Sequence, residues 1–218
     1  MRWGLEQSRN LMTVRAAADS GMENVTDTFR AMGIGDYQPY LSFALGAGDT
    51  TVLKITNAYS MLVNHGRELK PTLIDYAQNR KGKVILPAKW KPCGGCRAKD
   101  WNGKPMPRFF PAGKQVMDPI TAYQTVHMLE GVIERGTATI LRDLDRPLFG
   151  KTGTTTGPTK VWFIGGSPHV VAGVYLGYDQ PRNMGGYAQG GSLVAPIFKQ
   201  FARQALAGMP KTPFVAPD

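Results

Sequence analysis

The sequence predicts a single α+β domain in which helices pack on an antiparallel sheet. Two observations carry this prediction. Segments with helical periodicity dominate the chain up to about residue 64, and three strand-like segments follow one another after residue 148, with a last helix behind them. A chain of 218 residues also has the length of one substantial domain with one core.

Two short helices are expected near the N-terminus. Apolar residues at positions 11, 14 and 18, with polar residues between them, indicate an amphipathic helix over about residues 5–18, with Ser8 or Asn10 as its cap. Asn24 is expected to cap a second helix over residues 25–32, because two glycines follow closely and end the helical pattern.

Three further helices are expected along the chain. The clearest covers about residues 52–64 behind the capping segment Asp49-Thr50-Thr51, since its apolar residues recur at helical spacing. Asp118, followed by a proline, begins a helix that ends near residue 135. A last helix is expected over about residues 193–206. The buried face of the helix behind Asp118 is expected to consist of Ala122, Val126, Leu129 and Ile133.

The strand-like segments fall into two groups. Residues 72–77 and 83–86 flank a Gly-containing turn and indicate a peripheral hairpin. Residues 161–165 and 170–178 indicate two strands joined by a tight turn, directly after a Gly-Lys-Thr-Gly segment. Between the two groups, about residues 87–117 are dense in Pro, Gly and Lys without periodicity, which predicts an irregular insertion that projects from the domain.

The charge of the chain favours anionic partners without choosing among them. Lys and Arg number 26 against 16 Asp and Glu, for a formal charge of +10. The basic residues are scattered and do not form the aromatic-interleaved stripe of a nucleic-acid face, so no nucleic-acid partner is expected. No stretch approaches the roughly 20 apolar residues of a membrane span, and the N-terminus does not resemble a signal peptide.

The cysteines and histidines do not form a metal-binding pattern. Cys93 and Cys96 are separated by two glycines in a Pro- and Lys-rich loop, whereas His65, His127 and His169 show no metal-like spacing to this pair. No metal site and no cofactor are therefore expected. In an oxidising compartment the cysteine pair would favour a local disulfide over two free thiols. His169 falls in a turn, where we expect it to be exposed.

Two short motifs far apart in the chain resemble those of a known family. Lys151-Thr152-Gly153-Thr154 precedes a Trp-Phe pair in the next strand, and Ser8-Arg9-Asn10 stands upstream. Together they resemble the third and second motifs of penicillin-recognising serine enzymes, and the whole chain resembles class A penicillin-binding proteins. The resemblance implies a penicillin-binding, serine β-lactamase-like transpeptidase fold. It also implies a partial transpeptidase domain over residues 1–208 and a tail over 209–218.

The third motif has residues suited to binding a carboxylate. Lys151 supplies a cation, and Thr152 and Thr154 supply hydroxyl donors for charge-assisted hydrogen bonds. Such a carboxylate ends a D-alanyl-D-alanine stem peptide of peptidoglycan and is present in β-lactams, which are the ligands that the resemblance implies. Gly153 leaves space for a ligand backbone to pair with the strand, so an alanine there is expected to obstruct binding.

The resemblance also assigns roles to the upstream motif. Ser8 would relay a proton near the leaving amine, and Asn10 would position the substrate carbonyl. A bare Ser-x-Asn would more often be a helix cap, and only the downstream match favours the catalytic interpretation. For Lys151-Thr152-Gly153 the corresponding plain interpretation is a turn that enters a strand.

One element of the family is absent from this sequence. The acyl-enzyme mechanism needs a serine with a lysine three residues later, so that one helical turn brings the amine to the hydroxyl. Thr51 and Lys54 have this spacing but lie after Ser8, and they indicate an ordinary helix start. None of the six serines is followed by such a lysine: Ser8, Ser20, Ser42, Ser60, Ser167 and Ser192.

The missing pair leads us to expect that the chain is a fragment of a longer synthase. The resemblance implies that the parent protein is anchored in the inner membrane and faces the periplasm, whereas the fragment itself has no signal or anchor. A sheet without its first strands would expose an unpaired edge, which predicts poor solubility or dimerisation through that edge.

Other functions are compatible with the same residues. A D,D-carboxypeptidase or β-lactamase would hydrolyse the acyl-enzyme instead of transferring it to an amine acceptor. A non-catalytic binding or interaction module would keep the carboxylate site around Lys151 without chemistry. An in-frame Ser-x-x-Lys upstream of the chain would favour an incomplete enzyme over such a module.

Overall fold

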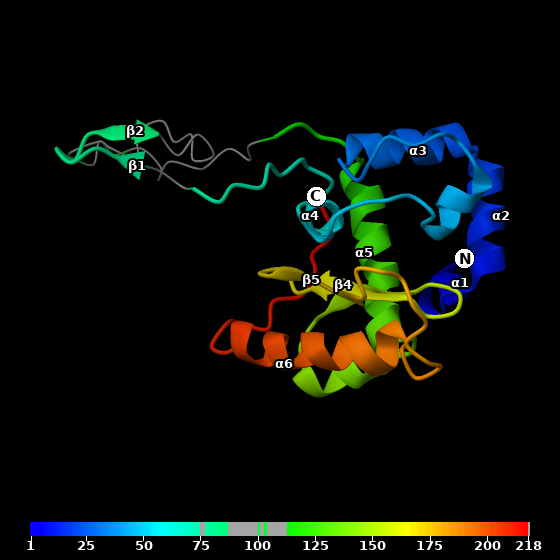
Figure 1. Ribbon diagram of the computed structural model, residues 1–218. Coiled ribbons are helices and arrows are strands. Elements are labelled where there is room, and N and C mark those ends of the chain that lie inside the picture. The colour runs from blue at the N-terminus through cyan, green and yellow to red at the C-terminus, as the bar shows by residue number, and fades with distance from the viewer. Residues whose placement is uncertain (75–76, 87–99, 101–102, 104–112, 218) are drawn as a thin grey trace.

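The protein is built around a three-stranded antiparallel sheet with helices on both faces (Figure 1). The computed structural model describes residues 1–74, 77–86, 100, 103 and 113–217. This architecture confirms the α+β prediction, including the order of helices, three consecutive strands and a final helix.

The sheet has the strand order β3-β4-β5. These strands cover Phe149–Thr154, Lys160–Gly166 and Val171–Gly177, respectively. The register pairs Thr152 with Phe163 and Gly153 with Trp162, and Phe163 pairs in turn with Val174. Since successive side chains of a strand point to opposite faces, Lys151 and Gly153 lie on one side of β3, and Thr152 and Thr154 lie on the other.

Helices α4 (Val52–Val63) and α6 (Ala195–Ala205) cover opposite faces of the sheet (Figure 1). A Cβ at Gly173 of β5 would lie 2.2 Å from the hydroxyl oxygen of Thr56, which shows how closely α4 approaches. On the other face, the rings of Phe163 and Phe198 are 4.6 Å apart. Helix α5 (Pro119–Glu134) packs against β3, α4 and α1 (Arg2–Glu6).

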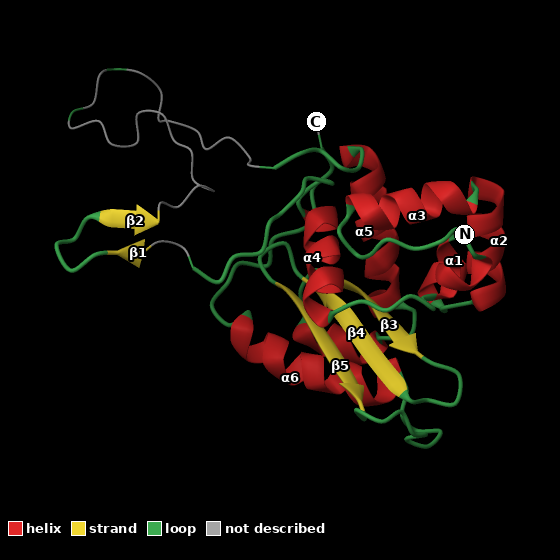
Figure 2. Ribbon diagram, turned by 45° about the horizontal axis from the view of Figure 1, so that its top comes forward, coloured by secondary structure: helices red, strands yellow, loops and turns green. Residues whose placement is uncertain are grey.

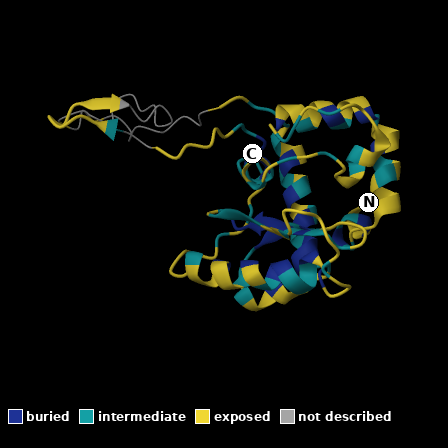
Figure 3. Cartoon of the chain, viewed as in Figure 1, coloured by how far each residue is buried: buried dark blue, intermediate teal, exposed yellow. Residues whose placement is uncertain are grey.

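The core lies between the sheet and the facing sides of α4, α5 and α6 (Figure 3). All four residues predicted for the buried face of α5 are buried. The largest fully buried side chains are Phe149, Phe163, Phe198, Leu141, Val126, Val132, Val161 and Val194.

The N-terminal segment forms two helices where a single one was predicted. Helix α1 ends at Glu6, and α2 covers Asn10–Ser20. The chain breaks between them because Ser8 adopts a left-handed backbone conformation with φ of 53°. Neither Ser8 nor Asn10 caps α2: the N-cap residue is Arg9, and no side chain makes a capping hydrogen bond.

Two details of the predicted N-terminal helices were also wrong. On α2 the buried residue is Ala17, whereas Leu11 and Ala18 are exposed, because η1 (Leu41–Leu45) packs on a different side of the helix from the one predicted. Helix α3 covers Met22–Ala31, so Asn24 lies inside its first turn, where its side chain donates to the carbonyl of Ser20.

The two predicted caps of the longer helices are confirmed. Thr51 accepts a hydrogen bond from the backbone N–H of Lys54 at 3.2 Å, so this pair is an ordinary helix start. Asp118 accepts from the backbone N–H of Thr121 at 2.8 Å. The short helical segment η2 (Thr139–Leu144) packs on α5 and α6, and η3 (Gly190–Val194) packs on the sheet and α6.

The predicted hairpin is present as β1 (Ala77–Gln78) and β2 (Val84–Leu86), paired antiparallel, but residues 72–74 of the first predicted strand are not strand. It stands away from the main body (Figure 2). Most of the predicted insertion over residues 87–117, with Cys93 and Cys96, lies outside the described residues. Among the helices that the structure does describe, none is long and apolar enough to cross a membrane.

Candidate active site

The third motif and the upstream motif meet in the structure. Lys151 lies on edge strand β3, and its Nζ donates a hydrogen bond to the hydroxyl of Ser8 at 2.6 Å. A second hydrogen bond joins the same Nζ to the carbonyl of Thr152 at 2.9 Å. Ser8 and Lys151 are 143 residues apart in sequence, so only the fold can bring them together.

The break between α1 and α2 presents the Ser8 hydroxyl. The backbone N–H of Arg9 donates to the carbonyl of Gly4 at 2.8 Å, which closes α1 just before α2 begins. Ser8 is exposed at this corner, as is Asn10 at the start of α2. The side chain of Asn10 makes no hydrogen bond with any other residue that the structure describes. The structure thus brings Ser8, but not Asn10, into contact with Lys151.

Burial changes the acidity of Lys151. Removal of its amine from water penalises the charged form and lowers the pKa of Lys151 from 10.5 to about 8. A lysine with this pKa holds a substantial fraction of neutral amine near pH 8, so it can exchange a proton with a hydroxyl beside it.

The same pKa predicts how stability depends on pH. Between pH 8 and about 10 the folded state releases the Lys151 proton before the unfolded state does, so the stability of the wild type should rise with pH relative to Lys151→Met. Urea unfolding of both proteins across this range checks it, and parallel curves would contradict it. The range stops near 10 because the unfolded-state lysine itself loses its proton around its ordinary pKa of 10.5, above which the difference between the two proteins no longer grows.

The two threonines of the third motif differ in their surroundings. Thr152 is buried, and its hydroxyl lies 2.6 Å from that of Thr137. Thr154 is exposed, and its hydroxyl accepts from the backbone N–H of Gly190 at 3.0 Å, which leaves its own proton free to donate. Thr152 is therefore turned to Thr137 and away from Lys151, whereas Thr154 remains accessible.

Gly153 lies against the aromatic residue paired with it. A Cβ at this position would stand 3.2 Å from Cβ of Trp162, so even alanine would crowd the strand. The Trp162 ring packs against Tyr175 of β5 with centroids 4.6 Å apart. Among the strands that the structure describes, only β4 pairs with β3, and such an edge suits the approach of an extended backbone.

Glu6, Arg135 and Thr137, to which the sequence analysis assigned no role, are joined by hydrogen bonds next to the site. The Arg135 guanidinium donates to both carboxylate oxygens of Glu6, at 3.0 and 2.7 Å. The backbone N–H of Thr137 also donates to the carbonyl of Glu6 at 3.2 Å. Glu6 and Arg135 are 129 residues apart, so no spacing rule could have linked them.

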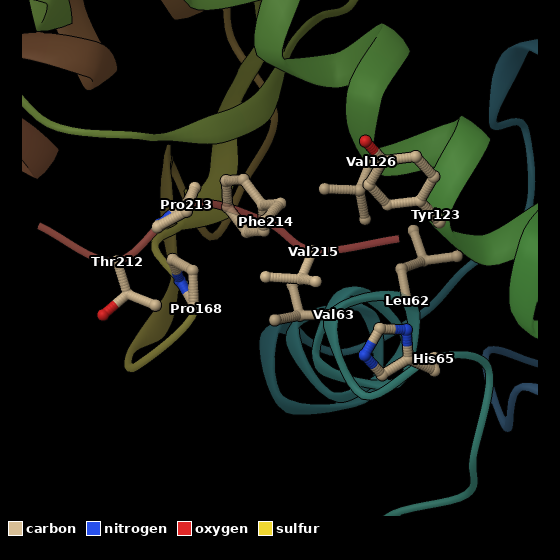
Figure 4. A pocket seen from close by; sticks show the side chains of 10 residues that line it. All are labelled: Leu62, Val63, His65, Tyr123, Val126, Pro168, Thr212, Pro213, Phe214 and Val215. Atoms are coloured by element: carbon tan, nitrogen blue, oxygen red, sulfur yellow. The ribbon is translucent and has the colours of Figure 1, made fainter. Parts of the chain in front are cut away.

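A separate pocket lies at the C-terminal tail and is distinct from this site (Figure 4). It has a volume of about 190 Å³, and the tail closes one side of it, with Phe214 packed edge-on against Phe149. His169 is exposed, as predicted, and contacts Thr212 of the tail at 2.8 Å. The lining residues are Leu62, Val63, His65, Tyr123, Val126, Pro168, Thr212, Pro213, Phe214 and Val215. No cluster of His, Cys, Asp and Glu within the described ranges could hold a metal ion.

Known proteins share both sequence and fold with this chain. Penicillin-binding protein 1A of Rickettsia bellii is 40% identical over 221 residues, and that of Neisseria flavescens is 32% identical over 221 residues. Each comparison covers the whole chain but only 28% and 26% of the relative, respectively, so the chain spans about a quarter of their length.

Solved structures show the same fold. Penicillin-binding protein 1A from Haemophilus influenzae aligns over 99% of this chain and 36% of that chain, with a TM-score of 0.82 and 24% identity. PonA1 from Mycobacterium tuberculosis in complex with penicillin V aligns over the whole chain and 59% of that chain, with a TM-score of 0.79 and 21% identity. The family model of the penicillin binding protein transpeptidase domain matches residues 1–203. With the identities of its relatives, this match shows that the chain belongs to the penicillin-binding protein transpeptidase family.

Proposed function

We propose that this chain forms part of a peptidoglycan D,D-transpeptidase domain, which cross-links stem peptides through an acyl-enzyme. The observation that carries the proposal is the 2.6 Å hydrogen bond between Lys151 and Ser8 beside the free edge of β3, in a chain of this family. The parent protein would act at the periplasmic face of the inner membrane, to which it would be anchored.

The site residues have distinct roles in this proposal. The Lys151 ammonium, on one face of β3, and the Thr154 hydroxyl, on the other, bind the terminal carboxylate of a D-alanyl-D-alanine stem peptide or a β-lactam around the edge of the strand. Gly153 lets the ligand backbone approach β3, and Thr152 holds the strand through Thr137. Ser8 relays a proton to the leaving amine, since its hydroxyl already shares a hydrogen bond with Lys151. Asn10 would reach the substrate carbonyl from the start of α2.

Ligand titration of the full 218-residue chain tests the carboxylate site. Diacetyl-L-lysyl-D-alanyl-D-alanine should shift NMR signals of β3, whereas the same peptide with a C-terminal amide should not, because the amide removes the charge that pairs with Lys151. Lys151→Ala should lose the response, and Lys160→Ala, on the neighbouring strand, is the matched control. Equal binding of the acid and amide peptides would contradict the proposed site.

A covalent test separates binding from acylation. No serine of this chain has a lysine three residues later, so incubation with a fluorescent penicillin should leave no adduct after denaturation. Intact mass measures the result directly. A stoichiometric adduct would identify a nucleophile within these residues and would replace the mechanism proposed here.

Self-association along β5 is a further part of the proposal. Only β4 pairs with β5 among the strands that the structure describes, and Tyr175 and Leu176 are each 37% exposed beside the other edge. Such an edge can pair with the same strand of a second copy. Light scattering after size exclusion should show dimers or larger species, which Leu176→Lys reduces and the exposed control Ile120→Lys does not. A wild-type monomer at all concentrations would contradict this.

A further inference from the structure

The segment Arg135-Gly136-Thr137, here called the bridge segment, contacts both elements that supply the Ser8–Lys151 hydrogen bond. On one side it is joined to the end of α1, two residues before Ser8. On the other side it is joined to Thr152, next to Lys151. The bridge segment therefore connects the two parts of the chain that meet at the site.

The attachment to α1 rests on a two-pronged ion pair. Arg135 Nε and Nη2 donate to the two carboxylate oxygens of Glu6. The Glu6 carboxylate is buried, with 3% of the side chain exposed, whereas the Arg135 side chain is 50% exposed. Planar guanidinium and carboxylate groups paired in this way fix orientation as well as distance. The ion pair thus sets the angle at which the end of α1 meets α5.

Two more hydrogen bonds complete this attachment. The side-chain amide of Gln7 donates to the carbonyl of Arg135 at 2.9 Å, and the backbone N–H of Thr137 donates to the carbonyl of Glu6 at 3.2 Å. Residues 6 and 7 are therefore held by both side chain and backbone. Ser8 follows directly, so its position depends on where these two residues are fixed.

Two glycines leave the space that this attachment needs. A Cβ at Gly131 of α5 would lie 2.1 Å from Oε1 of Glu6, and a Cβ at Gly136 would lie 2.4 Å from the Glu6 carbonyl oxygen. The carboxylate and backbone of Glu6 thus occupy the space that side chains would take at both glycines.

On its other side, the bridge segment is attached to β3 through a single side-chain hydrogen bond. The Thr137 hydroxyl lies 2.6 Å from the Thr152 hydroxyl, where Thr152 is buried and Thr137 is half-buried. A Cβ at Gly191 would lie 2.3 Å from the Thr137 carbonyl oxygen, and one at Gly190 would lie 2.9 Å from Thr152 Cβ. The η3 segment therefore holds the bridge segment against β3.

From these contacts we infer that Glu6 and Arg135 are positioning residues, which hold the Ser8 hydroxyl against the Lys151 amine through the bridge segment. The inference rests on the proposed function, since it concerns the same site. An ion pair that served stability alone could be weakened without any change at Lys151. A positioning pair, when weakened, should alter the surroundings of the Lys151 amine even in a folded protein.

Titration of the Lys151 amine tests this without any ligand. Trace acylation at a series of pH values, followed by digestion and mass spectrometry, gives the pH midpoint for Lys151. Arg135→Lys keeps the positive charge but loses the two parallel hydrogen bonds to the carboxylate. Glu6→Gln keeps the shape of the side chain but removes its negative charge. Glu134→Gln is the matched control, because Glu134 is 61% exposed and pairs with the same guanidinium at 2.7 Å.

The expected result is a midpoint near 8 in the wild type and in Glu134→Gln, because burial sets it. In Arg135→Lys and Glu6→Gln, displacement of the Ser8 segment admits water to the amine, so the midpoint should move upward toward 10.5. Circular dichroism and melting curves identify the variants that stay folded. Folded variants of Glu6 and Arg135 that keep the wild-type midpoint would overturn the inference.

A third variant covers the case in which the ion-pair variants fail to fold. Gly131→Ala keeps both Glu6 and Arg135, but its Cβ would overlap the Glu6 carboxylate and the Arg135 guanidinium, which are the ends of two side chains that can yield. The same upward shift is expected in this variant, and an unchanged midpoint in folded protein would count against positioning. If the wild-type chain binds no stem peptide, the proposed function fails, yet the titration still decides whether Glu6 and Arg135 position Ser8.

Discussion

Replacement of Phe163 by alanine is expected to lower the free energy of unfolding by about 3–5 kcal/mol. Phe163 is fully buried on β4, its ring packs on that of Phe198, and its outer edge lies beneath Gly150. Truncation would leave a cavity in the layer between the sheet and α6, and the tightly packed neighbours could not collapse into it. The loss is a large part of the 5–15 kcal/mol that usually stabilises a domain.

Phe201 provides the matched control for this truncation. It lies on the same helix as Phe198, with ring centroids 6.4 Å apart, but is 48% exposed. Phe201→Ala should therefore cost less than about 1 kcal/mol. Urea unfolding with an unchanged m value gives both numbers. Similar losses in the two variants would mean that the α6 layer does not carry the core.

Replacement of Gly165 by alanine is expected to be comparably damaging, with a loss of about 3 kcal/mol or more. The added Cβ would stand 2.2 Å from the carbonyl oxygen of Phe149 and 2.7 Å from Cα of Gly150. Both contacts are with backbone, so no rotamer change can relieve them. The variant must push β3 away from β4, which would also move Lys151.

Gly186→Ala is the control for this substitution. A Cβ at Gly186 would meet nothing within 4 Å, and its φ is not in the left-handed region. A change within about 0.5 kcal/mol is expected there. Thermal and urea unfolding of the two variants should differ clearly, and a Gly165→Ala protein as stable as the wild type would show that β3 and β4 can separate at little cost.

The sequence predicted those parts of the fold in which local pattern and packing agree. The face of α5 is an example, since Ala122, Val126, Leu129 and Ile133 recur at helical spacing and all four are buried. The caps at Thr51 and Asp118 followed from side chains that bond to nearby N–H groups. These features depend on neighbours within one or two turns, which sequence spacing describes well.

The break at Ser8 could not be predicted in the same way. The sequence offered Ser8 and Asn10 only as caps of one helix, whereas the left-handed backbone at Ser8 and the tertiary contacts of Glu6 and Gln7 end α1 and begin a second helix. The wrong apolar face on α2 has a related origin, because η1 rather than the sheet covers that helix.

The candidate site was only partly accessible from sequence. Motif resemblance named Ser8 and Lys151, and the structure places them in hydrogen-bond contact. The resemblance did not indicate that the Thr152 side chain would face Thr137. Which face of β3 a side chain occupies can be assigned only once the register with β4 is known. Glu6 and Arg135 carry no local signal at all, since their partnership arises from the packing of α1 on α5.

The left-handed backbone at Ser8 restricts which amino acids can occupy this position. Threonine bears the same hydroxyl as serine, but its branched Cβ makes a φ of 53° costly. Asparagine and glycine tolerate this conformation, yet neither offers a hydroxyl to the Lys151 amine. Among small side chains, serine alone meets both demands, so the amino-acid choice at this corner is set by conformation and chemistry together.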